Sequence, residues 1–122
     1  MVPVLEAVPN FSEGRDPELL ARLVEAVEER GAEVLDRSAD PDHHRSVITY
    51  VGDPASVEEA SVAAARIAVE EIDLGDHRGV HPRVGALDVL PFVPLMGLEM
   101  SDAVRSAHRV GRRLCDEVGV PV

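Results

Sequence analysis

The spacing of apolar residues along the chain predicts three helices. In the first, leucines and valines recur every three or four residues between Asp16 and Gly31. Asp16 suits an N-cap, Pro17 suits the first helical position, and Gly31 can end the helix. The same order of an N-cap residue, periodic apolar residues and a helix-ending residue occurs twice more. The predicted helices run from Pro17 to Gly31, from Asp53-Pro54 to about Ile72, and from Ser101-Asp102 through Cys115 to Gly119.

Short β-rich runs between the helices predict four strands. Pro9-Asn10 is expected to turn the chain after the first strand. The polar stretch SADPDHH, residues 38–44, is expected to join the second strand to the third. The predicted strands are Val2–Val8, Glu33–Arg37, Arg45–Val51 and Ala86–Leu95.

One segment shows neither a helical nor a strand period. Residues 73–85, DLGDHRGVHPRVG, contain three glycines and a proline and no repeat of apolar positions, so they predict a loop. A loop of this length in a compact domain is usually functional. The segment is therefore the first place to look for chemistry.

The predicted elements follow the order β-α-β-β-α-β, with one further helix at the C-terminal end. This order is typical of an α+β fold, the ferredoxin-like sandwich, in which an antiparallel sheet carries helices on one face. A chain of 122 residues has room for one such domain, over residues 1–122. Residues 120–122, Val-Pro-Val, resemble the start of another strand, so we expect the protein to continue beyond them.

Charge and composition disfavour several classes of partner. The chain holds 23 acidic and 12 basic residues, a net charge of −11, which opposes binding to nucleic acid and to anionic membranes. Only three aromatic residues are present, too few to stack nucleobases. The single cysteine, Cys115, excludes an intrachain disulfide and fits a reducing compartment. No apolar run approaches the ~18 residues of a membrane span, so we expect a cytoplasmic protein.

His81 is the candidate for acid–base catalysis. It lies within GVHPRVG, residues 79–85, where Pro82 restricts the backbone on one side. An imidazole, with an ordinary pKa of about 6.5, can take up and release protons near neutral pH. A loop histidine that only hydrogen-bonds a carbonyl gives the same pattern, so the residues alone leave both interpretations open.

Arginines near the histidines predict an anion site. Arg78 and Arg83 flank the loop histidine, and Arg45 follows two further histidines at 43–44. Guanidinium groups bind carboxylates through paired hydrogen bonds, so we expect a small anionic substrate. Asn10, the only side-chain amide, could hold a turn or reach into a cleft at the end of the sheet.

His77 and His81 have the spacing of a helical metal-binding pair. Such a pair shares one face only on a helix, and Gly79 and Pro82 argue against a helix here. We therefore expect no metal.

Three stretches of the chain together resemble one known family. They are VPNFSEGR (8–15), HHRSVITYVG (43–52) and HPRVGALDVLPFVPL (81–95). Their order and spacing are similar to the N-terminal subdomain of glutamate formimidoyltransferase over essentially the whole chain. The resemblance implies an enzyme of histidine breakdown. It would transfer a formimino group from N-formimino-L-glutamate to N5 of tetrahydrofolate, its co-substrate. It also implies that His81 is catalytic and that Asn10, Arg45 and Arg83 bind substrate.

Two features depart from the family pattern. Relatives commonly read His-Asn-Arg where this chain has His43-His44-Arg45, so the role of His44 is open. The second subdomain, which carries much of the folate site in the family, is absent, so we expect the chain to be inactive without it. A homo-oligomer is also expected. The competing hypothesis is a stand-alone binding or assembly module with the same fold and no catalysis.

Overall fold

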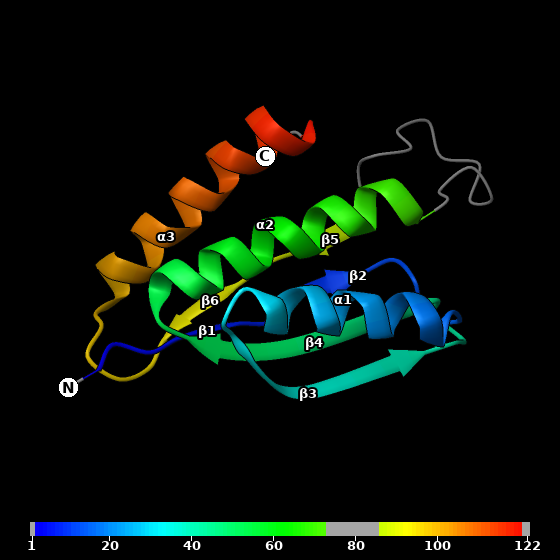
Figure 1. The fold of residues 1–122 in the computed structure, drawn as a ribbon, viewed down its shortest axis with the longest axis horizontal. Helices are drawn as coiled ribbons and strands as arrows, with labels where there is room; N and C mark the ends of the chain where they lie inside the picture. Colours follow the sequence, from blue (N-terminus) through cyan, green and yellow to red (C-terminus); the bar gives the residue numbers. More distant parts are fainter. Residues whose placement is uncertain (1, 73–85, 121–122) are drawn as a thin grey trace.

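The described residues, 2–72 and 86–120 of the computed structural model, form a curled antiparallel sheet with helices, an α+β arrangement (Figure 1). The strands are short, and most contain two or three residues. They are β1 (Leu5–Ala7), β2 (Asn10–Phe11), β3 (Glu33–Asp40), β4 (Arg45–Gly52), β5 (Leu87–Val89) and β6 (Phe92–Pro94).

The strand β4 organises the sheet. It pairs with β3 on one side and with both β1 and β2 on the other. In turn, β6 pairs with β1, and β5 pairs with β2, and every pairing is antiparallel. The pairs β1–β2 and β5–β6 therefore each run end to end. Each of the four predicted strand regions contains a strand, the fourth divided into β5 and β6, and β2 is an additional strand beyond the predicted end of the first at Val8.

Pro9 interrupts the first strand without ending it, which corrects the predicted turn at Pro9-Asn10. Proline has no N–H to give to the ladder. Its carbonyl nevertheless accepts a hydrogen bond from the N–H of Ile48 at 3.2 Å. The chain stays close to β4 and resumes pairing with Asn10 opposite Val47.

The β3–β4 hairpin is tighter than predicted, because β3 runs three residues further than Arg37. Ser38, Ala39 and Asp40 continue the ladder, and Asp40 lies opposite Arg45 at its end. Four residues, 41–44, form the turn. Three of the seven residues expected as a connection therefore belong to β3, and the other four form the turn.

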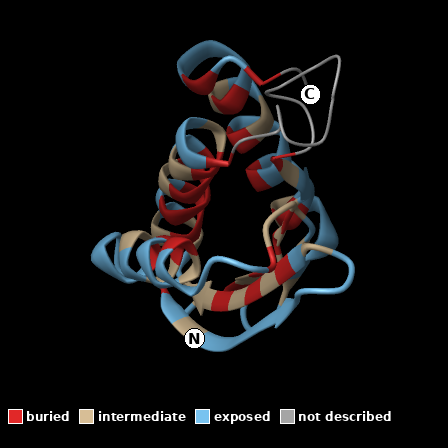
Figure 2. Ribbon diagram, turned by 90° about the vertical axis from the view of Figure 1, so that its right-hand side faces the viewer, coloured by how far each residue is buried: buried red, intermediate tan, exposed pale blue. Residues whose placement is uncertain are grey.

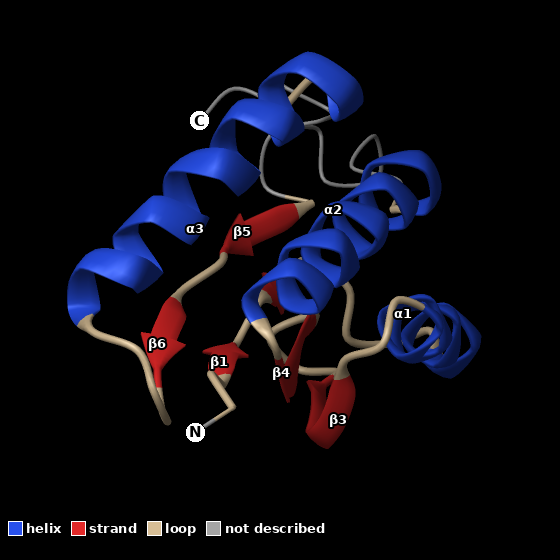
Figure 3. Ribbon diagram, turned by 60° about the vertical axis from the view of Figure 1, so that its left-hand side comes forward, coloured by secondary structure: helices blue, strands red, loops and turns tan. Residues whose placement is uncertain are grey.

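Three α-helices lie on one side of the sheet (Figure 3). The Asp16 carboxylate accepts hydrogen bonds from the N–H groups of Glu18 and Leu19, which confirms the predicted N-cap. Gly31 follows the first helix with a φ of +93°, as a glycine after a helix often does. The helices are α1 (Pro17–Glu29), α2 (Pro54–Glu71) and α3 (Met100–Arg113), and α3 continues as the π-helix η2 (Leu114–Val118).

The helix α3 begins earlier than its predicted cap at Ser101-Asp102. The Asp102 carboxylate accepts a hydrogen bond from the N–H of Glu99 at 2.8 Å, so it bonds backwards to the N-cap residue. At the other end, Gly119 has a φ of +83° and stops the helix as predicted. Its N–H donates to the carbonyl of Leu114 at 2.9 Å.

The core lies between the sheet and the first two helices (Figure 2). Tyr50 is fully buried in it and donates a hydrogen bond to Ser61 at 2.7 Å, while Ser61 donates to the carbonyl of Val57. Burial raises the pKa of Tyr50, so it stays protonated at any physiological pH. Other core members include Leu5, Phe11, Leu19, Leu23, Val27, Ile48 and the small residues Ala60, Ala64 and Ala68 of α2. No helix among the described residues is long and apolar enough to cross a membrane.

A polar cluster joins α3 to α2. The Glu58 carboxylate on α2 is nearly buried and accepts hydrogen bonds from Arg109 at 2.9 and 2.7 Å and from Ser106 at 2.8 Å. Burial alone would raise the pKa of Glu58, but these hydrogen bonds outweigh it and hold the pKa below its ordinary value. The charged carboxylate is therefore part of what holds α3 in place.

We expect Glu58→Gln to lower the free energy of unfolding by about 2 kcal/mol, because the charge-assisted bonds are lost. Glu59→Gln is the matched control, because Glu59 also pairs with an arginine of α3 but is exposed. It should cost less than about 1 kcal/mol. Urea unfolding of both variants measures the difference.

The same pair should show a pH signature. The folded state depresses the pKa of Glu58, so its contribution is present above the unfolded value of about 4.3 and is lost as the pH falls through the folded value. The stability gap between the parent chain and Glu58→Gln should therefore stay constant from about pH 7 to about pH 5 and shrink as the pH falls below about 4.3. A gap that stays constant below that pH as well would show that the ionised carboxylate is not what stabilises this contact.

Candidate functional site

One face of the sheet carries the predicted substrate residues. In β4, Ser46, Ile48 and Tyr50 are buried, toward the helices. Side chains alternate along a strand, so Arg45 and Val47 point to the opposite face. No helix of the described part of the chain covers that face (Figure 3). We call it the open face.

Asn10 and Arg45 lie on the open face together. Asn10 is directly opposite Val47, and Arg45 is two residues further along β4. Diagonal neighbours of this kind lie about 7 to 8 Å apart across an antiparallel pair. The Asn10 amide donates a hydrogen bond to the carbonyl of Val8 at 3.2 Å, across Pro9. Its amide thus contacts the backbone just before Pro9, where the predicted turn does not form.

The other predicted site residues, His81 and Arg83, lie outside the described residues, as do His77 and Arg78. The described chain resumes at Ala86, whose carbonyl accepts a hydrogen bond from the N–H of Ser12 at 3.0 Å. Ala86 itself therefore lies next to the loop that follows β2.

That loop is tied to the β3–β4 hairpin by contacts that we call the clasp, residues 13–15 against residues 40–45. Arg15 donates from Nε to the carbonyl of Pro41 at 2.8 Å. The N–H of Gly14 donates to Nδ1 of His44 at 3.0 Å. Gly14 is itself buried, so the loop and the hairpin are in close contact.

The clasp needs a glycine at its centre. A Cβ on Gly14 would lie 2.4 Å from the nitrogen of Arg45 and from the carbonyl oxygen of Asp40, both backbone atoms. These two residues form the last pair of the β3–β4 ladder. The position of Arg45 is therefore linked directly to the loop. In the sequence, Gly14 is one glycine between the first strand and the first helix. Its close approach to the backbone of Asp40 and Arg45 leaves no signal in the sequence.

His44 takes part in the clasp through a backbone conformation that few residues adopt. Its φ is +53°, in the left-handed region, where histidine occurs more often than most non-glycine residues. The Glu13 carboxylate lies 3.5 Å from Nδ1, too far for a hydrogen bond. That carboxylate accepts instead from the N–H groups of Arg15 and Asp16, at 2.8 and 3.0 Å.

His43 makes a different contact, with Asp40. Its Nδ1 lies 2.6 Å from Oδ2 of Asp40, and the N–H groups of Asp42 and His43 donate to Oδ1 at 3.0 and 3.2 Å. The hydrogen bond from the His43 side chain is the main reason that the pKa of Asp40 lies below its ordinary value. Asp40 is therefore ionised at neutral pH and accepts from all three groups.

A pocket of about 690 Å³ lies at this end of the sheet. Arg45 lines it and also forms a loose ion pair with Asp88 of β5 at 3.4 Å. Sequence reasoning did not single out Asp40, Ser38 or Asp88, although the first two stood in the stretch expected as a connection. The lining residues are Ser38, Ala39, Asp40, Pro41, His43, Arg45 and Val47.

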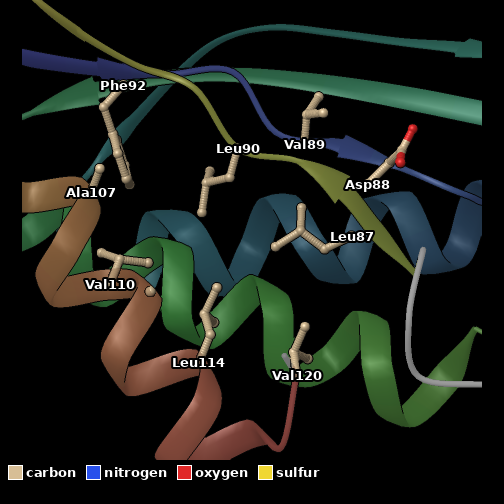
Figure 4. A pocket seen from close by; sticks show the side chains of 10 residues that line it. Leu87, Asp88, Val89, Leu90, Phe92, Ala107, Val110, Leu114 and Val120 are labelled. Carbon is tan, nitrogen blue, oxygen red and sulfur yellow. The ribbon is translucent and has the colours of Figure 1, made fainter. Parts of the chain in front are cut away.

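A second pocket, of about 320 Å³, lies between α3 and the strands β5 and β6 (Figure 4). Side chains of Leu90, Phe92 and Val110 point into it, and Asp88 is the charged residue at its edge. Among the described residues, Asp88 is the only polar side chain that lines this pocket, whereas the pocket beside Arg45 brings together Asp40, His43 and Arg45. The pocket beside Arg45 is therefore the better candidate site.

Metal binding finds no support in the described residues. No three histidine, cysteine, aspartate or glutamate side chains gather there closely enough to hold an ion. His77 and His81 lie outside this part of the chain, so metal independence stays a prediction.

Comparison with known proteins identifies the family. Residues 4–122 match the model of the formiminotransferase domain, N-terminal subdomain. The chain belongs to this family. The resemblance drawn from the three sequence stretches is thereby confirmed over almost the full length.

Several curated relatives agree with the family match. The chain is 47% identical to the formimidoyltransferase-cyclodeaminase of Gallus gallus, over all of this chain and 23% of that protein. It is 46% identical to the glutamate formimidoyltransferase of Thermoplasma acidophilum, over 98% of this chain and 40% of that protein. The corresponding protein of Streptococcus pyogenes serotype M1 is 40% identical, over all of this chain and 41% of its own length. The chain therefore spans between a quarter and two-fifths of the length of these formimidoyltransferases.

The clasp gives this formiminotransferase subdomain a sharp test. Gly14→Ala should lower the free energy of unfolding by about 1 to 3 kcal/mol, because the added Cβ meets backbone atoms that cannot move independently. The control is Gly52→Ala in β4, where the nearest atoms lie at 3.5 Å, an ordinary contact. That change should cost less than about 1 kcal/mol in the same denaturation experiment. Equal costs for the two variants would contradict the close approach at Gly14.

Proposed function

We propose that this chain is the N-terminal catalytic part of a glutamate formimidoyltransferase. It would help to move the formimino group of N-formimino-L-glutamate to N5 of tetrahydrofolate. The observation that carries the proposal is the family match over residues 4–122, with relatives that are named as formimidoyltransferases. The proposal is supported by the strand register, in which Asn10 and Arg45 share the open face, and by the pocket that Asp40, His43 and Arg45 line.

In the proposed reaction, N5 of tetrahydrofolate attacks the formimino carbon and forms a tetrahedral adduct. The bond from that carbon to the glutamate nitrogen then breaks. One proton must leave N5 and one must reach the departing nitrogen. His81 would carry this proton between the two nitrogens, a role that general acid–base groups fill with a rate gain of ~10² to 10⁴.

Arg45, Arg83 and Asn10 are proposed to bind the substrates. Arg45 is suited to this role, because its side chain is about half exposed and its ion pair with Asp88 is long. The carboxylates of N-formimino-L-glutamate are the groups that a guanidinium would bind. No metal takes part in the proposed reaction.

The open face is proposed to form one wall of a channel whose other wall comes from a second subdomain. We further propose that the fold is a ferredoxin-like sandwich, since β1–β2 lies between β4 and β5–β6 in the sheet, with β3 on the outer side of β4. The acidic, metal-free protein of this proposal is cytoplasmic and forms a homo-oligomer.

The first test concerns His81 in a longer protein made of this chain joined to a second subdomain. His81→Ala should lower the turnover for formimino transfer at least ~10²-fold, because proton transfer is lost. The melting temperature of the variant should stay near that of the parent, and circular dichroism measures it. Turnover at the parent rate would remove His81 from the mechanism.

The second test concerns the chain by itself. Alone it should show no measurable transfer, because one wall can neither exclude water nor align the reacting atoms, and alignment can supply about 7 to 11 kcal/mol. Addition of the remaining part of the protein should restore activity. Full activity from the isolated chain would overturn the two-walled site. No activity from either preparation would favour the alternative, a binding or assembly module.

A further inference from the structure

The two adjacent histidines of the hairpin use the same ring nitrogen, Nδ1, in opposite hydrogen-bonding roles. Nδ1 of His43 lies 2.6 Å from a carboxylate oxygen of Asp40, whereas Nδ1 of His44 accepts the N–H of Gly14. A neutral imidazole has one protonated and one unprotonated nitrogen, and the partner of one nitrogen fixes the state of the other.

His43 must carry its proton on Nδ1. Asp40 is ionised at neutral pH, since its pKa lies below the ordinary value, and a carboxylate can only accept. The neutral ring then has its lone pair on Nε2. The His43 side chain is 80% exposed, so this nitrogen can accept a hydrogen bond from a ligand.

Both oxygens of Asp40 are already engaged, which limits the repulsion that Asp40 would exert on an anion. Oδ1 accepts from the N–H groups of Asp42 and His43, and Oδ2 accepts from the His43 ring. The accessible groups beside it in the pocket are the Ser38 hydroxyl, Nε2 of His43 and the Arg45 guanidinium.

Arg45 is held weakly enough to exchange its partner. Its 3.4 Å contact with Asp88 is longer than the roughly 2.7 to 2.9 Å of a charge-assisted hydrogen bond. Both side chains are more than two-fifths exposed, and ion pairs of this kind contribute little. A carboxylate that enters the pocket can therefore replace Asp88.

We propose that the pocket beside Arg45 binds a ligand that carries a carboxylate next to an N–H donor, with Arg45 taking the carboxylate and Nε2 of His43 accepting from the N–H. If the proposed function is right, that ligand is N-formimino-L-glutamate, whose formimino group supplies the N–H. His43 is then a residue that distinguishes this substrate from a simple dicarboxylate.

The assigned tautomers can be observed directly. In the isolated 122-residue chain, ¹⁵N NMR at alkaline pH records which nitrogen of each ring carries the proton. We expect His43 with the proton on Nδ1 and His44 with the proton on Nε2. The reverse assignment for His43 would overturn the proposal, because Nε2 could then not accept.

Ligand discrimination is the second measurement. We expect N-formimino-L-glutamate to bind about tenfold more tightly than glutarate, which has two carboxylates and no N–H, in an NMR titration of this chain. His43→Leu should abolish this preference, and it should weaken the binding of both ligands to the same extent, because it frees Oδ2 of Asp40. His108→Leu, an exposed histidine change on α3, is the matched control and should retain the preference. Asp88→Asn should tighten the binding of both ligands, because it releases Arg45.

The outcomes separate this inference from the proposed function. Equal affinity for the two ligands, or an unchanged preference in His43→Leu, would overturn the role of His43 even if the longer protein catalyses transfer. Conversely, a preference that depends on His43 in this chain would support the pocket even if the longer protein shows no transfer.

Discussion

The alternation of side chains along β4 is the constraint on which the other features depend. Its even-numbered residues from Ser46 to Tyr50 pack under the helices, and its odd-numbered residues from Arg45 face the other way. Because β4 pairs with β1, β2 and β3, this single register also sets the facing of its neighbours. A shift by one residue would bury Arg45 and expose Tyr50. The helical layer and the open face are thus two results of one pattern.

Much of this arrangement could be predicted because it depends on local signals. The caps Asp16 and Asp53, each followed by proline, mark helix starts that the structure confirms. The small residues Ala60, Ala64 and Ala68 recur at helical spacing along α2, and all three are buried in the core. These signals involve residues only a few positions apart, so they can be recognised in the sequence alone.

Features that depend on distant contacts were missed or displaced. Pro9 reads as the end of a strand, but the N–H of Ile48, 39 residues away, bonds its carbonyl and keeps the chain in the sheet. Gly14 reads as an ordinary loop glycine, yet the hairpin leaves no room for a Cβ there. In both cases the deciding partner lies far along the chain, so the residue type alone does not reveal it.

The clasp also accounts for the departure from the family pattern at His44. The position demands a left-handed backbone and an acceptor for the N–H of Gly14. Asparagine, the residue expected there from the family pattern, and histidine both tolerate positive φ better than most residues. Each also carries its acceptor on Cγ, Oδ1 in asparagine and Nδ1 in histidine, so the acceptor is the same number of bonds from the backbone. The exchange therefore preserves the contact that fixes the loop against Arg45. What changes is the rest of the side chain, a larger ring with a second nitrogen in place of an NH₂ group.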